Sequence, residues 1–321
     1  MLLASISIIV GIALLVWSAD KFVAGSASLA RNMGMSPLLI GLTVVSLGTS
    51  APELLVSTTA ALVGASGIAI GNAIGSNIAN IGLVLGVTAL IVPLPIRSRL
   101  LRKELPILAV VTLLSGSLLF DNSLNRADGI LLVIALVITL YLFAKYQPGV
   151  GDSALLVEEE EELPHLSTKA SLFWFAFGLA LLIVSSRLLV WAATFIAQQL
   201  GVSDLIIGLT IIAIGTSLPE LAASIASALK GHHDIAIGNV IGSNIFNLLA
   251  VMSVPAIISP YSFDQALVWR DYSLVFILTA LLVYFCYTSI RSNKTIQIGR
   301  GKGSLFVMAY AGYLTLLFVQ S

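Results

Sequence analysis

The sequence predicts an all-α polytopic membrane protein, with about ten transmembrane helices in two inverted five-helix repeats. Three observations support this prediction: an apolar composition, a series of apolar segments of bilayer length, and an internal duplication. Of the 321 residues, 58% are hydrophobic and only 10% are charged, and the mean hydropathy is +1.03. In soluble domains about 25% of the residues are charged. The composition therefore excludes a soluble globular domain, and a net charge of zero without a basic stripe excludes a nucleic-acid-binding protein.

Apolar segments alternate with charged or turn-rich stretches, and each is close to the roughly 20 residues that cross a bilayer core. The predicted spans are 2–24, 36–62, 68–92, 104–120, 127–146, 170–199, 203–229, 235–259, 271–289 and 304–320. The first has no basic stretch before its apolar run, so we expect a retained helix rather than a signal peptide. The predicted domains are a first five-helix repeat over 1–146, an acidic cytoplasmic linker over 147–169 and a second, inverted repeat over 170–321.

The residues that most often bind metals or form disulfides follow no recognisable pattern. Cys286 is the single cysteine, which excludes a disulfide framework or a Cys-based metal site within the chain. The histidines His165, His232 and His233 fall in polar stretches, and we interpret them as loop residues. The acidic run 158–162 is typical of a solvated linker. We expect no tightly bound cofactor.

Two segments of the chain are copies of one another. Gly41–Asn80 aligns without a gap with Gly208–Asn247, at an offset of about 167 residues, and about 24 of the 40 aligned positions are identical. Each half has about five spans, which is an odd number, so the second half must enter the membrane from the opposite side. The duplication therefore predicts an inverted-topology repeat.

The distribution of positive charge predicts the orientation of the chain. Cytoplasmic loops of membrane proteins are enriched in Lys and Arg. If the N-terminus is outside, the predicted cytoplasmic segments contain every Lys and Arg except Arg126, Arg187 and Arg270. We therefore expect both termini outside and the acidic linker inside.

Two carboxylates lie deep within predicted spans, at equivalent positions of the two copies. These are Glu53 and Glu220, whereas the other acidic residues fall in loops or near span ends. A charge at membrane depth costs about 2.5–3.5 kcal/mol on insertion scales, which marks it as a candidate functional group. No Lys or Arg is expected beside them, since Arg187 falls near a helix end, and two converging carboxylates would repel each other. A divalent cation is the natural partner.

The motif GTSxPE surrounds each glutamate and predicts a broken helix. Pro52 and Pro219 have no N–H group, which frees the carbonyl four residues earlier. Irregular backbone at this depth is tolerated where it lines a cavity or an ion site. The motif also supplies hydroxyl oxygens, from Thr49, Ser50, Thr216 and Ser217.

The second motif, GNxIGSNIxN, repeats polar residues at a spacing of four, which places them on one helix face. These residues are Asn72, Ser76 and Asn80 in one copy, and Asn239, Ser243 and Asn247 in the other. Such residues alone are often packing contacts between membrane helices, but the duplicated set favours an ion site. Because all the candidate ligands are oxygens, hard cations such as Ca²⁺ or Na⁺ are favoured over zinc or copper. Two glutamates balance one Ca²⁺, while several Na⁺ could share the same oxygens.

The paired motifs resemble the α-repeats of the cation/Ca²⁺ exchanger superfamily, in particular those of bacterial sodium/calcium antiporters. The resemblance covers nearly the whole chain and implies alternating access of Ca²⁺ and Na⁺ to four clustered cation sites. By motif position, it implies a central Ca²⁺ site of Glu53, Glu220, Thr49 and Thr216. The implied Na⁺ ligands are Ser50, Ser76 and the Ser46 carbonyl in one half, and Ser217, Ser243 and the Ala213 carbonyl in the other.

The resemblance implies a secondary antiporter rather than an enzyme, in a bacterial or archaeal cytoplasmic membrane. Its partners would be Ca²⁺, Na⁺ and the lipid bilayer, without an obligate protein partner. Some members of the superfamily have Asp in place of Asn80 or Asn247, and Asn at both positions argues against K⁺-dependent or H⁺-coupled variants. A Ca²⁺/H⁺ or other cation/H⁺ antiporter on the same fold is the alternative, and a cation channel is a more remote one. An intramembrane serine hydrolase would need a general base, and no His or Lys is expected at that depth.

Overall fold

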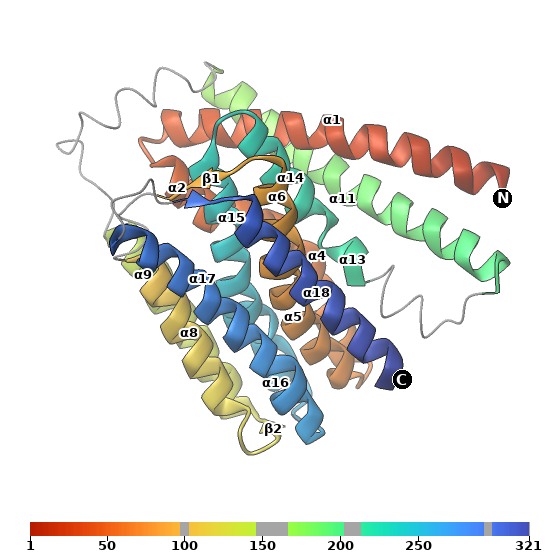
Figure 1. The fold of residues 1–321 in the computed structure, drawn as a ribbon, viewed down its shortest axis with the longest axis vertical. Helices are drawn as coiled ribbons and strands as arrows, with labels where there is room; N and C mark the ends of the chain where they lie inside the picture. Colours follow the sequence, from red (N-terminus) through yellow and green to blue (C-terminus); the bar gives the residue numbers. More distant parts are fainter. Residues whose placement is uncertain (97–102, 146–165, 202–212, 292–296, 321) are drawn as a thin grey trace.

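The structure, a computed structural model, describes residues 1–96, 103–145, 166–201, 213–291 and 297–320, most of which are helical (Figure 1). Within these residues, seven helices are long and apolar enough to cross a membrane, or eight if one bent pair is counted as a single span. The prediction of a helical, multi-span membrane protein is therefore confirmed.

The long helices α1 (Leu2–Asn32) and α11 (Thr168–Gln199) lie side by side along one flank of the molecule (Figure 1). Their backbones touch through glycines. A Cβ atom on Gly25 would lie 2.5 Å from the nitrogen of Phe175, and one on Gly178 would lie 2.7 Å from the nitrogen of Phe22. Because Gly178 lies against Phe22 and Gly25 lies against Phe175, the two helices run antiparallel.

Helix α1 extends eight residues beyond the predicted end of the first span at residue 24, as far as Asn32. The hydropathy falls after residue 24, where the small and polar residues of 25–30 begin. In the folded protein these six residues are buried, because all of them except Leu29 have small side chains that allow close helix packing. Packing against neighbouring helices therefore stabilises the helix beyond residue 24, where hydropathy alone predicts its end.

The first copy of the duplicated segment forms two antiparallel stretches of helix. The first stretch contains α2 (Pro37–Ile40), the π-helical segment η1 (Gly41–Val45), α3 (Ser46–Thr49) and α4 (Ala51–Leu62). It bends by 43° between Thr49 and Ala51. The second stretch contains α5 (Ser66–Ala79), the π-helical η2 (Asn80–Leu85) and α6 (Gly86–Ile91).

The second copy repeats these elements. It contains α13 (Ala213–Thr216), α14 (Leu218–Leu229), α15 (His233–Phe246), the π-helical η4 (Asn247–Val251) and α16 (Ser253–Ile258). The first part of the predicted span 203–229 lies outside the described residues. Segments η2 and η4 begin at equivalent asparagines, Asn80 and Asn247, and short π-helical turns are frequent at functional sites.

The two spans that carry the second motif occupy the centre of the protein. Of their most apolar windows, 72% is buried for Ser66–Ile91 and 78% for His233–Ile258, against 17% for Arg300–Val319. The remaining helices lie further out: α8 (Glu104–Leu118), α9 (Arg126–Lys145), the π-helical η5 (Leu267–Tyr272), α17 (Ser273–Arg291) and α18 (Arg300–Gln320). Each of them buries one set of apolar side chains in the core and exposes others, such as Val110, Ile134 and Phe276, as expected of helices that contact lipid.

Two short β-ladders connect the halves, and the sequence analysis did not predict them. Strand β1 (Leu94–Pro95) pairs antiparallel with β4 (Gln297–Ile298), and β2 (Ser123–Leu124) pairs antiparallel with β3 (Tyr261–Ser262). Each strand has two residues, which is too short for the alternating pattern by which strands are recognised.

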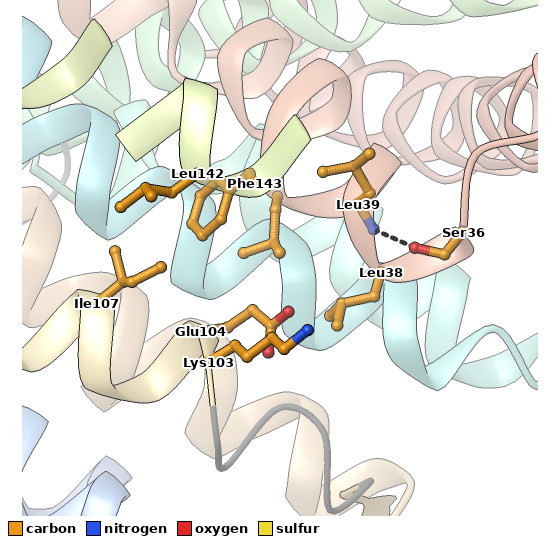
Figure 2. A pocket seen from close by; sticks show the side chains of 9 residues that line it. Ser36, Leu38, Leu39, Lys103, Glu104, Ile107, Leu142 and Phe143 are labelled. Atoms are coloured by element: carbon orange, nitrogen blue, oxygen red, sulfur yellow. Dashed lines mark hydrogen bonds between the residues drawn. The ribbon is translucent and has the colours of Figure 1, made fainter. Parts of the chain in front are cut away.

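Helix α2 begins with a clear capping signal (Figure 2). The Ser36 hydroxyl accepts a hydrogen bond of 3.2 Å from the Leu39 N–H, and Pro37 occupies the first turn. The side chains of Lys103 and Glu104, at the start of α8, lie side by side next to Leu38. The chain therefore enters the stretch that leads to the GTSxPE motif from a fixed starting point.

Candidate cation site

The two GTSxPE motifs place a carboxylate in the first turn of α4 and of α14. Each proline lies in that first turn, where the missing N–H group leaves no hydrogen bond unmade. The free N–H groups and the dipole of a helix N-terminus favour a negative charge. Glu53 and Glu220 are each only 1% exposed. The motif thus starts a helix inside the protein and puts an acid at its positive end.

The two halves bring these acids to one place. The hydroxyl of Ser50, in the first half, donates a hydrogen bond of 3.2 Å to the Oε1 atom of Glu220, in the second. The Oε2 atoms of Glu53 and Glu220 are buried and have no hydrogen-bond partner among the described residues. In that part of the chain neither acid forms an ion pair, and there is no cluster of three or more His, Cys, Asp or Glu residues. The centre is therefore a pair of carboxylates among neutral oxygens.

The carbonyl of Gly215, four residues before Pro219, accepts a hydrogen bond from a side chain of another helix. The Ser186 hydroxyl, on α11, donates a hydrogen bond of 2.7 Å to the carbonyl of Gly215. The sequence analysis did not single out Ser186, since a serine in an apolar span usually serves packing. The equivalent residue of the first half is Ala19, so this contact is particular to the second half.

Asn72 ties α5 to the start of α4. Its side-chain nitrogen donates to the main-chain carbonyl of Glu53 at 3.1 Å and to the Ser57 hydroxyl at 3.1 Å. Ser57 in turn donates to the carbonyl of Ala69 at 3.2 Å. Asn72, predicted as a secondary ligand, therefore makes direct contact with the backbone of a candidate ligand residue.

Asn239 makes the same contacts in the second half. Its side-chain nitrogen donates to the carbonyl of Glu220 at 3.3 Å and to the Ser224 hydroxyl at 3.0 Å. Its side-chain oxygen accepts a hydrogen bond of 3.0 Å from the hydroxyl of Thr49, in the first half. Asn239 thus connects the two halves at the site. Neither Ser57 nor Ser224 was predicted, although both are identical in the aligned copies.

Several predicted ligands are buried with atoms that have no partner among the described residues. This holds for both side-chain atoms of Asn80 and of Asn247, and for the hydroxyls of Ser217 and Ser243. Ser76 is also buried, with 5% exposed. An unmade hydrogen bond at a buried polar group costs about 1–3 kcal/mol. These atoms lie on segments that pack against the two glutamate helices or belong to them, and together they indicate a place built to hold a ligand.

The remaining predicted ligands differ in their surroundings. The Ser46 carbonyl already accepts hydrogen bonds from the Ser50 N–H, at 2.9 Å, and from the Thr49 hydroxyl, at 3.4 Å. Thr216 is half-buried, and Ala213 is the first residue of α13. The structure also shows buried amides that sequence reasoning missed: Asn77 and Asn244 each donate to the carbonyl four residues earlier at 2.8 Å.

Comparison with known proteins shows the family of this chain. The family model described as sodium/calcium exchanger protein matches residues 3–145 and 170–319. The chain belongs to this family. The two matched segments cover both copies of each motif and lie on either side of the acidic stretch.

Individual proteins match this chain over nearly their whole length. The chain is 50% identical over 323 residues to the putative antiporter CaxA of Alkalimonas amylolytica, covering 99% of both proteins. It is 41% identical over 322 residues to the inner membrane protein YrbG of Escherichia coli K12, covering 99% of this chain and 98% of the relative. Among solved structures, the sodium-calcium exchanger NCX_Mj, soaked with zero Na⁺ and Ca²⁺, superimposes with a TM-score of 0.84 and 33% identity, covering 98% of this chain and 99% of that chain. This exchanger-family chain is therefore a membrane protein with the fold of a cation/Ca²⁺ exchanger.

Proposed function

We propose that the protein is a secondary antiporter that exchanges Na⁺ for Ca²⁺ by alternating access at the site between the two halves. The observation that carries this proposal is the pair of buried carboxylates, Glu53 and Glu220, which have no cationic side chain beside them in the described structure. Two carboxylates balance the charge of one Ca²⁺, and hard cations prefer oxygen ligands. The solved relative NCX_Mj is named a sodium-calcium exchanger, which supports the same pair of ions.

The proposed ligands follow the motif positions, with the ions as substrates and without a resident cofactor. Ca²⁺ would bind Glu53, Glu220, Thr49 and Thr216. Na⁺ would bind on either side of it, and Asn80 and Asn247 would offer amide oxygens close by. The Na⁺ ligands would be Ser50, Ser76 and the Ser46 carbonyl in the first half, and Ser217, Ser243 and the Ala213 carbonyl in the second.

The same proposal includes the membrane arrangement. The chain would form ten spans as two inverted repeats, 1–146 and 170–321, with helices interrupted at GTSxPE near the bilayer midplane. Both termini would lie outside and the linker 147–169 inside a bacterial or archaeal cytoplasmic membrane. The antiparallel packing of α1 on α11 supports the inverted arrangement, because these helices hold equivalent positions in the two halves.

A Ca²⁺/H⁺ antiporter is the second candidate function. The observation in its favour is the same pair of acids, since a buried carboxylate without a cationic neighbour can carry a proton. Asn80 and Asn247 favour Na⁺ coupling, because neither can change its charge as the pH changes.

Flux measurements in proteoliposomes separate the candidates. We expect Ca²⁺ uptake into Na⁺-loaded vesicles when the outside is free of Na⁺, and little uptake when both sides contain equal Na⁺. Uptake driven by a pH gradient in the complete absence of Na⁺ would show H⁺ coupling instead. Uptake at the same rate with and without an opposing gradient would show a channel. If more than two Na⁺ exchange for each Ca²⁺, the flux will also respond to the membrane potential.

A further inference from the structure

We propose that Ser57 and Ser224 are positioning residues for the cation site, acting through the side-chain amides of Asn72 and Asn239. Each serine fixes the orientation of its asparagine, and the asparagine then holds the start of the glutamate helix. In the second half the asparagine also orients the Thr49 hydroxyl. This inference rests on the proposed function only in that the site binds Ca²⁺.

The acceptors around Asn72 determine which way its amide points. The main-chain carbonyl of Glu53 can only accept, so the atom facing it at 3.1 Å must be the amide nitrogen. Ser57 uses its own hydrogen on the carbonyl of Ala69, so its oxygen is free to accept the second N–H of the amide. Both hydrogens of the Asn72 amide are therefore used, and its oxygen must face away from α4.

In the second half, the amide of Asn239 has the same orientation, and its oxygen contacts a residue of the first half. The nitrogen of Asn239 is taken by the Glu220 carbonyl and the Ser224 hydroxyl, which leaves its oxygen toward Thr49. The Thr49 hydroxyl donates to that oxygen at 3.0 Å, a shorter contact than the 3.4 Å to the Ser46 carbonyl. Both of these oxygens can only accept, so the single hydrogen of the Thr49 hydroxyl favours the shorter contact, the one to Asn239. The lone pairs of the Thr49 oxygen then remain available for a cation.

The contact to the glutamate carbonyl fixes the acids themselves. Each asparagine bridges the central helix, α5 or α15, to the first turn of α4 or α14, where the acid begins. A cation site needs its ligands held to about 0.5 Å, by neighbours that are themselves held. Loss of the serine would allow the amide to rotate, and both the helix start and the threonine hydroxyl would lose a defined position.

The chain offers a matched control on the same helix. Ser227 lies one turn beyond Ser224 on α14 and is 1% exposed, and its hydroxyl has no partner in the described structure. The equivalent residue of the first half is Ala60, so Ser227→Ala makes the two halves alike at this position. A buried serine that merely packs should behave like Ser227.

Calcium binding to the purified full-length protein, measured by isothermal titration calorimetry, tests the proposal. We expect Ser224→Ala to raise the Kd for Ca²⁺ by about fivefold, the effect of one lost hydrogen bond. Ser224→Thr, which keeps the hydroxyl, should stay near wild type, as should Ser227→Ala. Ser57→Ala gives the same test in the first half should Ser224→Ala fold poorly.

A second variant distinguishes positioning from packing. In the double variant Ser224→Ala/Asn239→Ala, we expect a Kd equal to that of Asn239→Ala alone, because the serine acts only through the amide. Additive effects, or a wild-type Kd in Ser224→Ala, would overturn the proposal. Because this readout is equilibrium Ca²⁺ binding, it does not depend on which ion drives transport, and failure of Na⁺-driven flux would count against the proposed function alone.

Discussion

The Ser50 hydroxyl donates a hydrogen bond to the Glu220 carboxylate, which joins the first half of the chain to the acid of the second. The two GTSxPE motifs lie about 167 residues apart in the sequence, and this contact shows that they meet in space. Both acids are almost fully buried, so the medium between them screens charge poorly. Each carboxylate therefore depends on the other, and on the cation that we propose binds between them.

Neutralising either acid should abolish Ca²⁺ transport. In Glu53→Gln and Glu220→Gln we expect the Kd for Ca²⁺ to rise by about a hundredfold or more, since a lost buried charge partner costs about 3 kcal/mol. Calorimetry and proteoliposome flux measure this directly. Glu104→Gln is the matched control, because Glu104 is buried but lies at the start of α8 beside the turn that begins α2. Flux retained in either site variant would contradict the assignment of the acids.

A third carboxylate at the site should make Ca²⁺ binding depend on pH. Both side-chain atoms of Asn247 lack partners among the described residues, so Asp fits there without breaking a hydrogen bond. In Asn247→Asp we expect tighter Ca²⁺ binding at alkaline pH, because one more negative charge faces the ion. This gain should shrink as the pH falls and the acid takes up a proton. Titrations at several pH values measure it, and a variant with the pH dependence of wild type would disprove the placement of Asn247 beside the ion.

The contact between α1 and α11 should tolerate no added methyl group. In Gly25→Ala and Gly178→Ala the new Cβ would collide with backbone atoms of Phe175 and Phe22, which cannot move aside as a side chain can. We expect a loss of about 1–3 kcal/mol in the free energy of unfolding, as for other overpacked cores. Thermal unfolding in detergent measures this loss. Gly312→Ala on α18 is the control, since no described atom lies within 4 Å of its added Cβ.

The ion pair between Asp20 and Lys230 should favour one conformation of the transport cycle. The Lys230 ammonium lies 2.7 Å from the Asp20 carboxylate and donates to the Asp20 carbonyl at 3.1 Å. Asp20 corresponds to Arg187 in the second half, and Lys230 corresponds to Val63 in the first. Arg187 and Val63 cannot form such a pair. If transport exchanges the conformations of the two halves, this contact exists in one state and has no counterpart in the other.

We therefore expect Asp20→Asn and Lys230→Gln to change the ratio of the apparent Ca²⁺ affinities on the two sides of the membrane, both in the same direction. Flux from right-side-out and inside-out vesicles measures this ratio. The charge-reversed double variant Asp20→Lys/Lys230→Asp should restore it. Opposite shifts in the two single variants would show that the residues act separately.

The central pair of acids could be predicted because two independent signals agree on it. Glu53 and Glu220 are polar where the surrounding sequence is apolar, and each has a copy in an equivalent context. Duplication predicts that two residues are related, and burial in the structure shows that both are inside. The position of an acid within an apolar span and its repetition in a second copy are both visible in the sequence. This part of the site could therefore be predicted without a structure.

The residues that support the site were not accessible in this way. Ser186 approaches the Gly215 carbonyl from another helix, and the bond depends on how closely α11 packs. Ser57 and Ser224 are identical in the two aligned copies, but about 24 of the 40 aligned positions are identical, so identity alone does not single them out. The end of α1 was predicted too early for a related reason: its last turns are stabilised by a neighbour that lies far away in the sequence. Contacts between distant segments carry little local signal.

The two β-ladders have a consequence for the origin of the chain. Leu94 of β1 pairs with Ile298 of β4, and Tyr261 of β3 pairs with Leu124 of β2, with β1 and β3 at equivalent positions. Each half thus contributes one strand to each ladder, and the two ladders make equivalent contacts in opposite directions. This is the reciprocal contact of an isologous dimer. A single five-helix ancestor could have closed both ladders by pairing with a second copy of itself, before gene duplication and fusion joined the two subunits into one chain.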